Sequence, residues 1–293
     1  MAHDTQSALR VELARAKVNL ALHVTGQRPD GYHLLDSLVA FPQIGDRVAL
    51  EPAAGLELRV EGPFARDIDG PSDSNLILKA VRAFAECAGT PVPKVRLTLT
   101  KRLPVASGIG GGSSDAATTL RLLEDYSGNY LPEETLHDLA LSLGADVPVC
   151  LYPEPQRMRG IGDELAPGPQ LPVCGIVLIN PKVGVSTPDV FKNMSQRDNP
   201  AMPELPGRFN SVVQLTEYLS ECRNDMQDAA VSLCPEIGNV LSAFDVDSRI
   251  AFSRMSGSGA TCYGVCELRD AMDIERQLRT AHPGWWIASG SLS

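Results

Sequence analysis

The 293-residue sequence contains no apolar run long enough to cross a membrane. Its longest apolar stretches, such as GIVLI at residues 175–179, are far shorter than the about 20 residues that a spanning helix requires. The first residues, MAHDTQSALRVEL, lack both the apolar core of a secretory signal and the acid-free composition of a transit peptide. We therefore expect a cytoplasmic protein that does not act on a membrane.

Cysteine and basic residues are both scarce. The seven cysteines are scattered, and only Cys262 and Cys266 lie close together, with no histidine near them in sequence. A structural zinc site needs four suitably spaced ligands, so free and mostly buried thiols are the better interpretation. Lysine and arginine total 26 against 36 acidic residues, a formal net charge of −10. Such a surface disfavours nucleic acid, and local amides and a few placed cations would have to hold a phosphate-bearing substrate.

Strands and helices are mixed along the chain without steady alternation. Hydrophobic residues make up 43% and charged residues 21%, which is typical of a globular protein, and the length suits one large or two ordinary domains. The lack of regular strand–helix–strand units favours the α+β class over a doubly wound sheet. Proline and glycine are dense between residues 153 and 172, which predicts an N-terminal domain over residues 1–165 and a C-terminal domain over residues 166–293.

Local patterns predict the main elements. Apolar residues alternate in ARAKVNLALHV, which predicts one strand over residues 14–24 with Lys17 and Asn19 on the face opposite to Leu20. The turn sequence PDG follows, and further strands are expected over 34–42, 46–50, 94–104 and 174–181. Helices are expected to end at Gly89 and Gly144, and the chain closes with a glycine-rich strand–turn–strand and a helix over 270–281.

The segment LPVASGIGGGSSDAATTL, residues 103–120, is the strongest local signal of function. Gly108, Gly110, Gly111 and Gly112 can adopt positive φ and offer bare N–H groups, and Ser113 or Ser114 is expected to cap the helix that follows. A glycine-rich turn that leads into a helix gathers unpaired amides at the positive end of the helix dipole. The segment therefore predicts a phosphate-binding loop.

Two familiar phosphate motifs do not fit this segment. No lysine precedes the serines, which excludes the G-x-x-x-x-G-K-[ST] loop, and a serine stands where the dinucleotide fingerprint has its third glycine. A flexible connector between strand and helix remains the plain alternative.

The loop PVASGIGGGSSDAA resembles the central phosphate-loop motif of the galactokinase, homoserine kinase, mevalonate kinase and phosphomevalonate kinase (GHMP) superfamily. Other blocks extend the resemblance from about residue 14 to residue 266 and are similar to one branch, the 4-diphosphocytidyl-2-C-methyl-D-erythritol kinases. They are AKVNLALHVTGQRPDGYHLLDSL, LGADVPVCL, PKVGVSTPDVFKN and RMSGSGATCYG. The first block is more specific than the glycine loop, which the whole superfamily shares.

The resemblance implies a fold and a reaction. The expected fold is a two-domain α+β protein with a ribosomal-protein-like N-terminal half, a ferredoxin-like C-terminal half and the active site in the cleft between them. The expected activity is ATP- and Mg²⁺-dependent phosphorylation of the 2-hydroxyl of a cytidine diphosphate-linked sugar alcohol in the non-mevalonate isoprenoid pathway. Neither the protein ligand of Mg²⁺ nor the oligomeric state follows from the resemblance.

The resemblance also implies roles for individual residues. Asp146 would be the general base for the acceptor hydroxyl, and Lys17 would orient the reacting groups and stabilise negative charge. The rival carboxylate, Asp115, lies at the start of the loop helix, where it would repel phosphates, so we expect it to be structural. The loop residues expected to hold ATP phosphates are Pro104, Val105, Ala106, Ser107, Gly108, Ile109, Gly110, Gly111, Gly112, Ser113 and Ser114. The residues expected on the substrate side are Asn19, Tyr32, His33, Thr187 and Phe191, with His33 at the cytosine and the base held between Tyr32 and Phe191.

Two other functions remain open from the sequence. The same fold could act on a smaller acceptor such as mevalonate or homoserine, but such acceptors offer no base to stack on Phe191. A nucleotide-binding sensor without catalysis is the second alternative, and the presence of both Lys17 and Asp146 argues against it. His23, His137 and His282 form no recognisable constellation and are expected to be structural.

Overall fold

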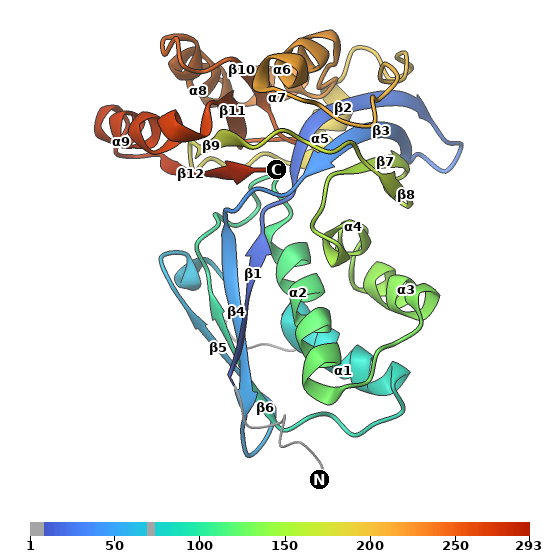
Figure 1. The fold of residues 1–293 in the computed structure, drawn as a ribbon. Helices are drawn as coiled ribbons and strands as arrows, with labels where there is room; N and C mark the ends of the chain where they lie inside the picture. Colours follow the sequence, from blue (N-terminus) through green and yellow to red (C-terminus); the bar gives the residue numbers. More distant parts are fainter. Residues whose placement is uncertain (1–8, 69–73) are drawn as a thin grey trace. The chain divides into compact units, whose positions relative to one another are not determined.

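The computed structural model describes residues 9–68 and 74–293, which form two compact units (Figure 1). Unit 1 contains the chain up to Ala16, Gly45–Val105 and Gly110–Tyr152, and unit 2 contains Lys17–Ile44, Ala106–Ile109 and Pro153–Ser293. The predicted division at residue 165 therefore differs from the observed one in two ways. The chain passes from unit 1 to unit 2 for the last time after Tyr152. Two earlier segments, Lys17–Ile44 and Ala106–Ile109, also belong to unit 2.

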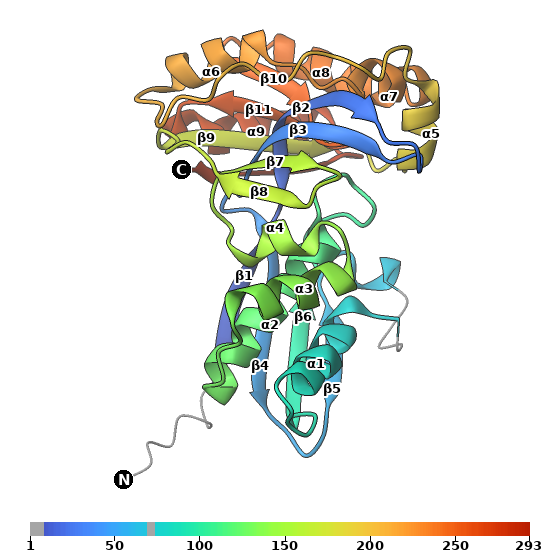
Figure 2. The same cartoon turned by 90° about the vertical axis from the view of Figure 1, so that its right-hand side faces the viewer.

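Unit 1 is a four-stranded sheet with helices on one face (Figures 1 and 2). Its strands lie in the order β1 (Arg10–Arg15), β4 (Gly45–Pro52), β6 (Val95–Thr100) and β5 (Glu57–Glu61). The β5–β6 pair is parallel and the other two pairs are antiparallel. The helices are α1 (Leu76–Cys87), α2 (Gly111–Ser127), α3 (Glu133–Leu143) and α4 (Val147–Leu151), and η2 (Ala65–Asp67) is a short 3-10 turn. Helix α2 packs against β1 and β4.

The predicted ends of two helices are confirmed. Helix α1 begins after Asn75, whose side chain accepts a hydrogen bond from the N–H of Ile77 at 2.9 Å, and the chain leaves it through the left-handed Gly89. Helix α3 begins after Pro132 and ends before Gly144. Local capping chemistry was sufficient to place both helices.

The first sheet of unit 2 is an antiparallel meander of β2 (Val18–Gln27), β3 (His33–Ala40), β7 (Gln156–Gly160) and β8 (Glu164–Pro167). The single strand expected over residues 14–24 is therefore wrong, because β1 ends at Arg15, β2 starts at Val18, and the two strands belong to different units. The pairing of β3 with β7 also explains the displaced domain boundary. Strand β3 pairs with β7, which lies after Pro153 in the sequence. Local composition cannot predict a pairing between segments so far apart.

The second sheet of unit 2 is antiparallel, in the order β10 (Phe252–Met255), β11 (Cys262–Cys266), β9 (Cys174–Asn180) and β12 (Trp286–Leu292). Helices α5 (Thr187–Asn193), α6 (Val212–Glu221), α7 (Gln227–Leu233) and α8 (Glu236–Asp245) connect β9 to β10, while η3 (Leu268–Asp270) and α9 (Ala271–Ala281) connect β11 to β12. Two crossovers around a central first strand give the ferredoxin-like arrangement that was expected.

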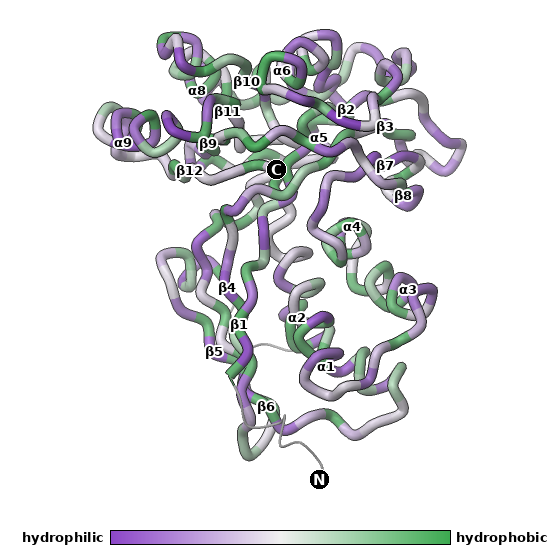
Figure 3. Tube along the Cα trace, viewed as in Figure 1, coloured by the Kyte–Doolittle hydropathy of each residue, from purple (hydrophilic) through white to green (hydrophobic). Residues whose placement is uncertain are grey.

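One hydrophobic cluster joins the two sheets of unit 2. All residues of β9 and β11 are buried, and β9 is predominantly hydrophobic in Figure 3. Leu22 of β2 lies in the same cluster as Ile179 of β9, and the Tyr263 hydroxyl donates to the Leu20 carbonyl at 2.6 Å. Strand β2, which carries Asn19, is thereby fixed against the ferredoxin-like sheet.

The expectation of free, mostly buried thiols is confirmed, since all seven cysteines are free and six of them are buried. None of the helices in the described ranges has the length and apolar character needed to cross a membrane.

Candidate active site

The glycine-rich loop leads into α2 through a left-handed turn. Gly108 and Gly110 adopt positive φ values of 75° and 61°, as predicted, and Gly110 is the residue before the first turn of α2. No side chain caps this helix, so its first N–H groups are left for other acceptors. The loop thus has the amide-rich end that a phosphate group can bind.

Two details of the loop prediction are wrong. Ser113 and Ser114 do not cap α2, because the helix already begins at Gly111 and both serines lie inside it. The Ser114 hydroxyl instead donates to the Arg15 carbonyl at 2.6 Å. Gly111 and Gly112 are helical and do not adopt positive φ. At Gly111 the constraint is space, since a Cβ there would lie 3.1 Å from the Nζ of Lys101.

A buried charged cluster supports the first turns of α2 in unit 1. Lys101 forms an ion pair with Asp115 at 2.9 Å and another with Asp46, and all three side chains are at most 5% exposed. Asp46 also accepts from the main-chain N–H of Leu103 at 2.8 Å, which fixes the start of the loop. Burial raises the pKa of Asp115 to about 7, against the opposing effect of Lys101. These contacts support the structural role predicted for Asp115.

The middle of the glycine loop packs on the second glycine-rich turn in unit 2, residues 256–261. The N–H and hydroxyl of Thr261 both donate to the Ser107 carbonyl, at 3.3 and 2.6 Å. A Cβ at Gly108 would lie 2.4 Å from the Gly259 carbonyl oxygen, so only glycine fits there. The middle of the glycine loop and the second glycine-rich turn therefore form one structural element of unit 2.

Lys17 and Asn19 lie beside this element. Lys17 directly precedes β2, is only 5% exposed, and its main-chain N–H donates to the Ile109 carbonyl at 2.9 Å. The main-chain N–H of Asn19 donates to the Ser256 hydroxyl at 3.0 Å, and its side-chain amide donates to Ser37 at 2.8 Å. Both predicted residues are thus buried next to the loop.

Helix α5 carries the other predicted residues of unit 2. Thr187 and Phe191 lie one turn apart on this helix, and the Thr187 hydroxyl is 2.7 Å from that of Ser258 in the second glycine-rich turn. The ring of Phe191 stacks on the imidazole of His33, with centroids 4.1 Å apart and an angle of 9° between the planes. Tyr32, next to His33, is 61% exposed.

Contacts within unit 2 therefore join the middle of the glycine loop to Thr187, Phe191 and His33 in one continuous series. The series runs from Ser107, Gly108 and Ile109 through Ser256–Thr261 to Thr187, and along α5 to Phe191 and His33. Ser256 and Thr261 were not singled out from the sequence, although the serines and glycines of RMSGSGATCYG could have signalled a second loop.

Asn224 also escaped the sequence analysis. Its side-chain amide donates to the carbonyls of Met255 and Gly257, at 2.8 and 2.9 Å, and so holds the second glycine-rich turn in place. The signal for it is weak, since an Asn-Asp pair before a helix is ordinary turn chemistry.

Asp146 lies in unit 1, at the residue before α4. It is partly buried, and its side chain does not cap the short helix. Helix α4 is buried along its length, and Arg121 donates to the carbonyls of Cys150 and Leu151 at 3.0 and 3.1 Å. The carboxylate of Asp146 is thus carried at the start of a firmly held helix.

Sequence comparison identifies both halves of the chain. Residues 75–154 match the family described as GHMP kinases N terminal domain, and residues 208–284 match GHMP kinases C terminal.

Across the described residues no group of three or more His, Cys, Asp or Glu side chains is arranged to hold a metal ion.

Individual relatives narrow the assignment. Proteins named 4-diphosphocytidyl-2-C-methyl-D-erythritol kinase from Cereibacter sphaeroides and Ruegeria pomeroyi are each 50% identical to the chain. Each alignment covers 94% of this chain and 96% or 97% of the relative. A crystal structure of 4-(cytidine 5'-diphospho)-2C-methyl-D-erythritol kinase matches with a TM-score of 0.77 at 33% identity, over 97% of this chain and 99% of that one. The chain therefore belongs to the GHMP kinase family, in the branch of the 4-diphosphocytidyl-2-C-methyl-D-erythritol kinases.

Proposed function

We propose that the protein transfers the γ-phosphoryl group of ATP to the 2-hydroxyl of 4-diphosphocytidyl-2-C-methyl-D-erythritol. The relatives with this name support the substrate, since they are 50% identical over most of their length. The observation that carries the proposal is the series of contacts in unit 2. It connects the glycine-rich loop, through Ser256–Thr261 and Thr187, to the aromatic pair of Phe191 and His33. A phosphate-binding element and an aromatic surface on one scaffold suit a nucleotide-linked acceptor.

The loop Pro104–Ser114 would hold the phosphates of ATP. Gly108 and Gly110 provide the left-handed turn, and the uncapped start of α2 supplies N–H donors. These local donors matter because the formal net charge is −10. Mg²⁺, when bound with ATP, would neutralise phosphate charge.

Asp146 would accept the proton of the acceptor hydroxyl, and Lys17 would orient the hydroxyl and stabilise the negative charge that develops on it. Phosphoryl transfer has a loose transition state, so an ordinary carboxylate is sufficient as the base. A buried lysine provides this stabilisation without a large solvent reorganisation, and Lys17 is 5% exposed.

The nucleotide end of the substrate would lie on the aromatic residues of unit 2. Phe191 provides a ring face, Tyr32 provides an exposed second ring, and His33 provides a hydrogen-bonding edge. Thr187 and Asn19, each held by a serine hydroxyl near the loop, would contact the part of the substrate between base and acceptor hydroxyl.

Free thiols at all seven cysteines suit a reducing compartment, so we place the reaction in the cytoplasm.

The decisive experiment is ADP release with a panel of acceptors. The cytidine-linked sugar alcohol should be turned over, whereas free methylerythritol phosphate, mevalonate and homoserine should be poor acceptors. Efficient turnover of mevalonate or homoserine would be consistent with a kinase of this fold, but it would show that the proposed cytidine-linked substrate is wrong. A protein that binds ATP but releases no ADP with any acceptor would instead support the sensor.

The role of Asp146 is tested in the same assay with Asp146→Asn. Loss of a general base should lower kcat by about 10²–10⁴-fold, while the KM for ATP stays unchanged. Asp138→Asn is the control, because Asp138 is an exposed carboxylate on α3. Near-normal turnover by Asp146→Asn would exclude this residue as the base.

A further inference from the structure

Unsatisfied buried polar atoms gather around Phe191. In the described ranges three buried side-chain nitrogen or oxygen atoms have no hydrogen-bond partner: the Nε2 of His33, the Nε of Arg197 and the Oδ1 of Asp115. An unsatisfied buried polar group costs about 1–3 kcal/mol, so each one requires a physical reason. Asp115 belongs to the charged cluster of unit 1, whereas His33 contacts Phe191 and Arg197 binds the residue after it.

The imidazole of His33 covers one face of Phe191. The two ring centroids are 4.1 Å apart and the planes are nearly parallel, which leaves no room for a third ring between them. A base inserted there would need about twice that separation. A pyrimidine can use this face only after the imidazole has moved away.

Arg197 is held beside this pair at the end of α5. Its guanidinium donates to the Lys192 carbonyl at 2.9 Å, one residue after Phe191, while its Nε remains buried and unpartnered. Burial lowers the pKa of the His33 imidazole, and electrostatic repulsion by the positive charge of Arg197 lowers it further.

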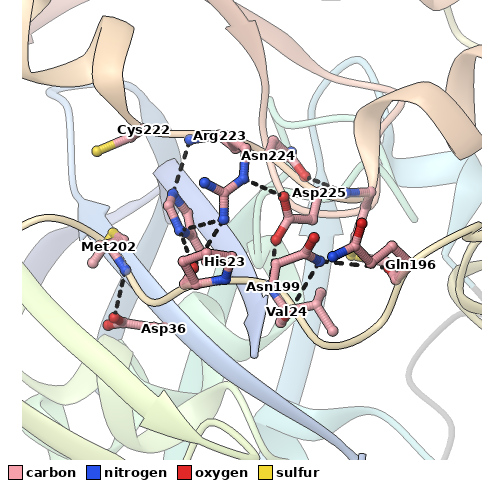
Figure 4. A network of polar contacts seen from close by, with 12 residues as sticks. His23, Val24, Asp36, Gln196, Asn199, Met202, Cys222, Arg223, Asn224 and Asp225 are labelled. Carbon is pink, nitrogen blue, oxygen red and sulfur yellow. Dashed lines mark hydrogen bonds and ion pairs between the residues drawn. The ribbon is translucent and has the colours of Figure 1, made fainter. Parts of the chain in front are cut away.

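The segment that follows Arg197 is anchored to β2, to β3 and to Arg223 (Figure 4). The N–H and side-chain amide of Asn199 both donate to the Val24 carbonyl at 3.1 Å, and the N–H of Met202 donates to Asp36 at 3.0 Å. The Pro200 carbonyl accepts from Arg223 at 2.9 Å. The stretch of chain directly after Arg197 is therefore fixed, and Arg197 itself is held by the Lys192 carbonyl.

We propose that Arg197 is a further specificity-determining residue of the nucleotide site, and that the pyrimidine displaces His33 from Phe191 and accepts a hydrogen bond from the Arg197 Nε–H. The inference rests on the proposed function, since the ligand is the base of the nucleotide-linked acceptor. One aromatic ring replaces another on Phe191, so little stacking is lost. The two unsatisfied nitrogens gain partners on the edge of the base, and this gain favours the exchange.

The first test measures binding of cytidine 5′-diphosphate by calorimetry to the unmodified protein and to Arg197→Gln. A hydrogen bond from a charged donor corresponds to about 10- to 150-fold in affinity, and the variant should lose affinity within this range. Arg197→Lys keeps the charge but lacks Nε, and it should also bind more weakly. Arg269→Gln is the matched control, because its side chain is 84% exposed on the same unit, and it should bind normally.

Inorganic pyrophosphate separates the base from the phosphates as the target of Arg197. The proposal requires Arg197→Gln to bind pyrophosphate as the unmodified protein does. An equal loss of affinity for pyrophosphate and for cytidine 5′-diphosphate would show that Arg197 binds phosphate, and the proposal would be wrong. In turnover assays the KM for the cytidine-linked acceptor should rise, with kcat and the KM for ATP unchanged.

The displacement of His33 is tested by NMR of its ring protons. Stacking on Phe191 should shift them upfield in the free protein, and saturating cytidine 5′-diphosphate should remove this shift. Arg197→Gln should also raise the pKa of His33, whereas Arg197→Lys should not. Ring protons that stay shifted while the nucleotide binds would overturn the exchange. If the unmodified protein binds cytidine 5′-diphosphate with displacement of His33 but phosphorylates no cytidine-linked acceptor, the proposed function fails and this inference stands.

Discussion

Two histidines of unit 2 differ in burial and in bonding. His23 on β2 is fully buried, its Nε2 accepts from the main-chain N–H of Arg223 at 2.9 Å, and its Nδ1 lies 3.0 Å from the Pro200 carbonyl (Figure 4). His33, at the start of β3, stacks on Phe191 and leaves its Nε2 without a partner. Burial lowers the pKa of both. The difference separates a histidine that holds the fold from one that is available to a ligand.

The same contrast extends to charged groups. The guanidinium of Arg223 donates hydrogen bonds to Asp225 and to the Pro200 carbonyl. Asp225 in turn accepts from the N–H of Val24 at 2.8 Å. Arg197, in contrast, has a buried Nε with no acceptor. A hydrogen-bond network in which each donor has an acceptor stabilises the fold. A network with unpaired donors can instead form hydrogen bonds with a ligand. Three predictions test this division.

Opening the charged cluster of unit 1 should have the largest effect. Lys101→Met leaves the buried carboxylates of Asp46 and Asp115 facing each other without their cation. Loss of one partner from a buried ion pair costs about 3–5 kcal/mol in the free energy of unfolding. Urea denaturation should show this loss, while Lys192→Met, at a side chain 76% exposed, should change little. Equal stability of the two variants would show that the cluster is not a structural support.

Truncation at the aromatic pair should weaken binding of the acceptor. Base–aromatic stacking contributes about 1–3 kcal/mol, so Phe191→Ala should raise the KM for the cytidine-linked acceptor by about 5- to 150-fold. The KM for ATP should hardly change. Phe191→Leu keeps an apolar side chain without a ring and should behave like the alanine variant. Normal KM values for the cytidine-linked acceptor in both variants would show that the base does not stack on Phe191.

The smallest effect is a pH dependence at His23. Burial, reinforced by Arg223, lowers its pKa in the folded protein, although Pro200, Asp225 and Asp36 act in the opposite direction. The unfolded chain therefore takes up a proton first as the pH falls below about 6.5, and stability is lost from there down to the folded pKa. One proton accounts for at most about 1.4 kcal/mol per pH unit.

His23→Gln keeps one acceptor and one donor but cannot titrate. The difference in unfolding free energy between this variant and the unmodified protein should change between pH 7 and pH 5. Taking the difference removes the opposite contribution of Asp115, whose pKa is raised to about 7 and which therefore gains stability on acidification. A flat difference for His23→Gln would contradict the partnered, neutral state of His23.

Much of the fold follows from local sequence chemistry. Asn75 and Gly89 mark the ends of α1, and Gly108 and Gly110 mark the turn into α2, because caps and left-handed turns select particular residues. The ferredoxin-like half was expected through the resemblance. The break between β1 and β2 was not predictable in this way, since Ala16 and Lys17 continue the alternation while the strands on either side join different sheets.

The sequence predicts which residues form the candidate site, but it does not predict how they are arranged. The motif blocks name Lys17, Thr187 and Phe191, but no local pattern shows that His33 stacks on Phe191. Arg197 escaped notice because it is one charge in a polar segment, and its unsatisfied Nε depends on how residues from β2 and β3 hold that segment. Contacts between residues far apart in sequence carry this information.

The discontinuous make-up of unit 2 has a consequence for biosynthesis. Strands β2 and β3 leave the ribosome early, yet their partner strand β7 begins only at Gln156. At about 5–20 residues per second, the interval from Ile44 to Pro153 lasts on the order of 5–20 s. During that time the edge of β3 and the apolar side chains of β2, including Leu22, lack their eventual neighbours. The nascent chain thus has a window in which a chaperone that covers exposed β-edges would protect it from aggregation.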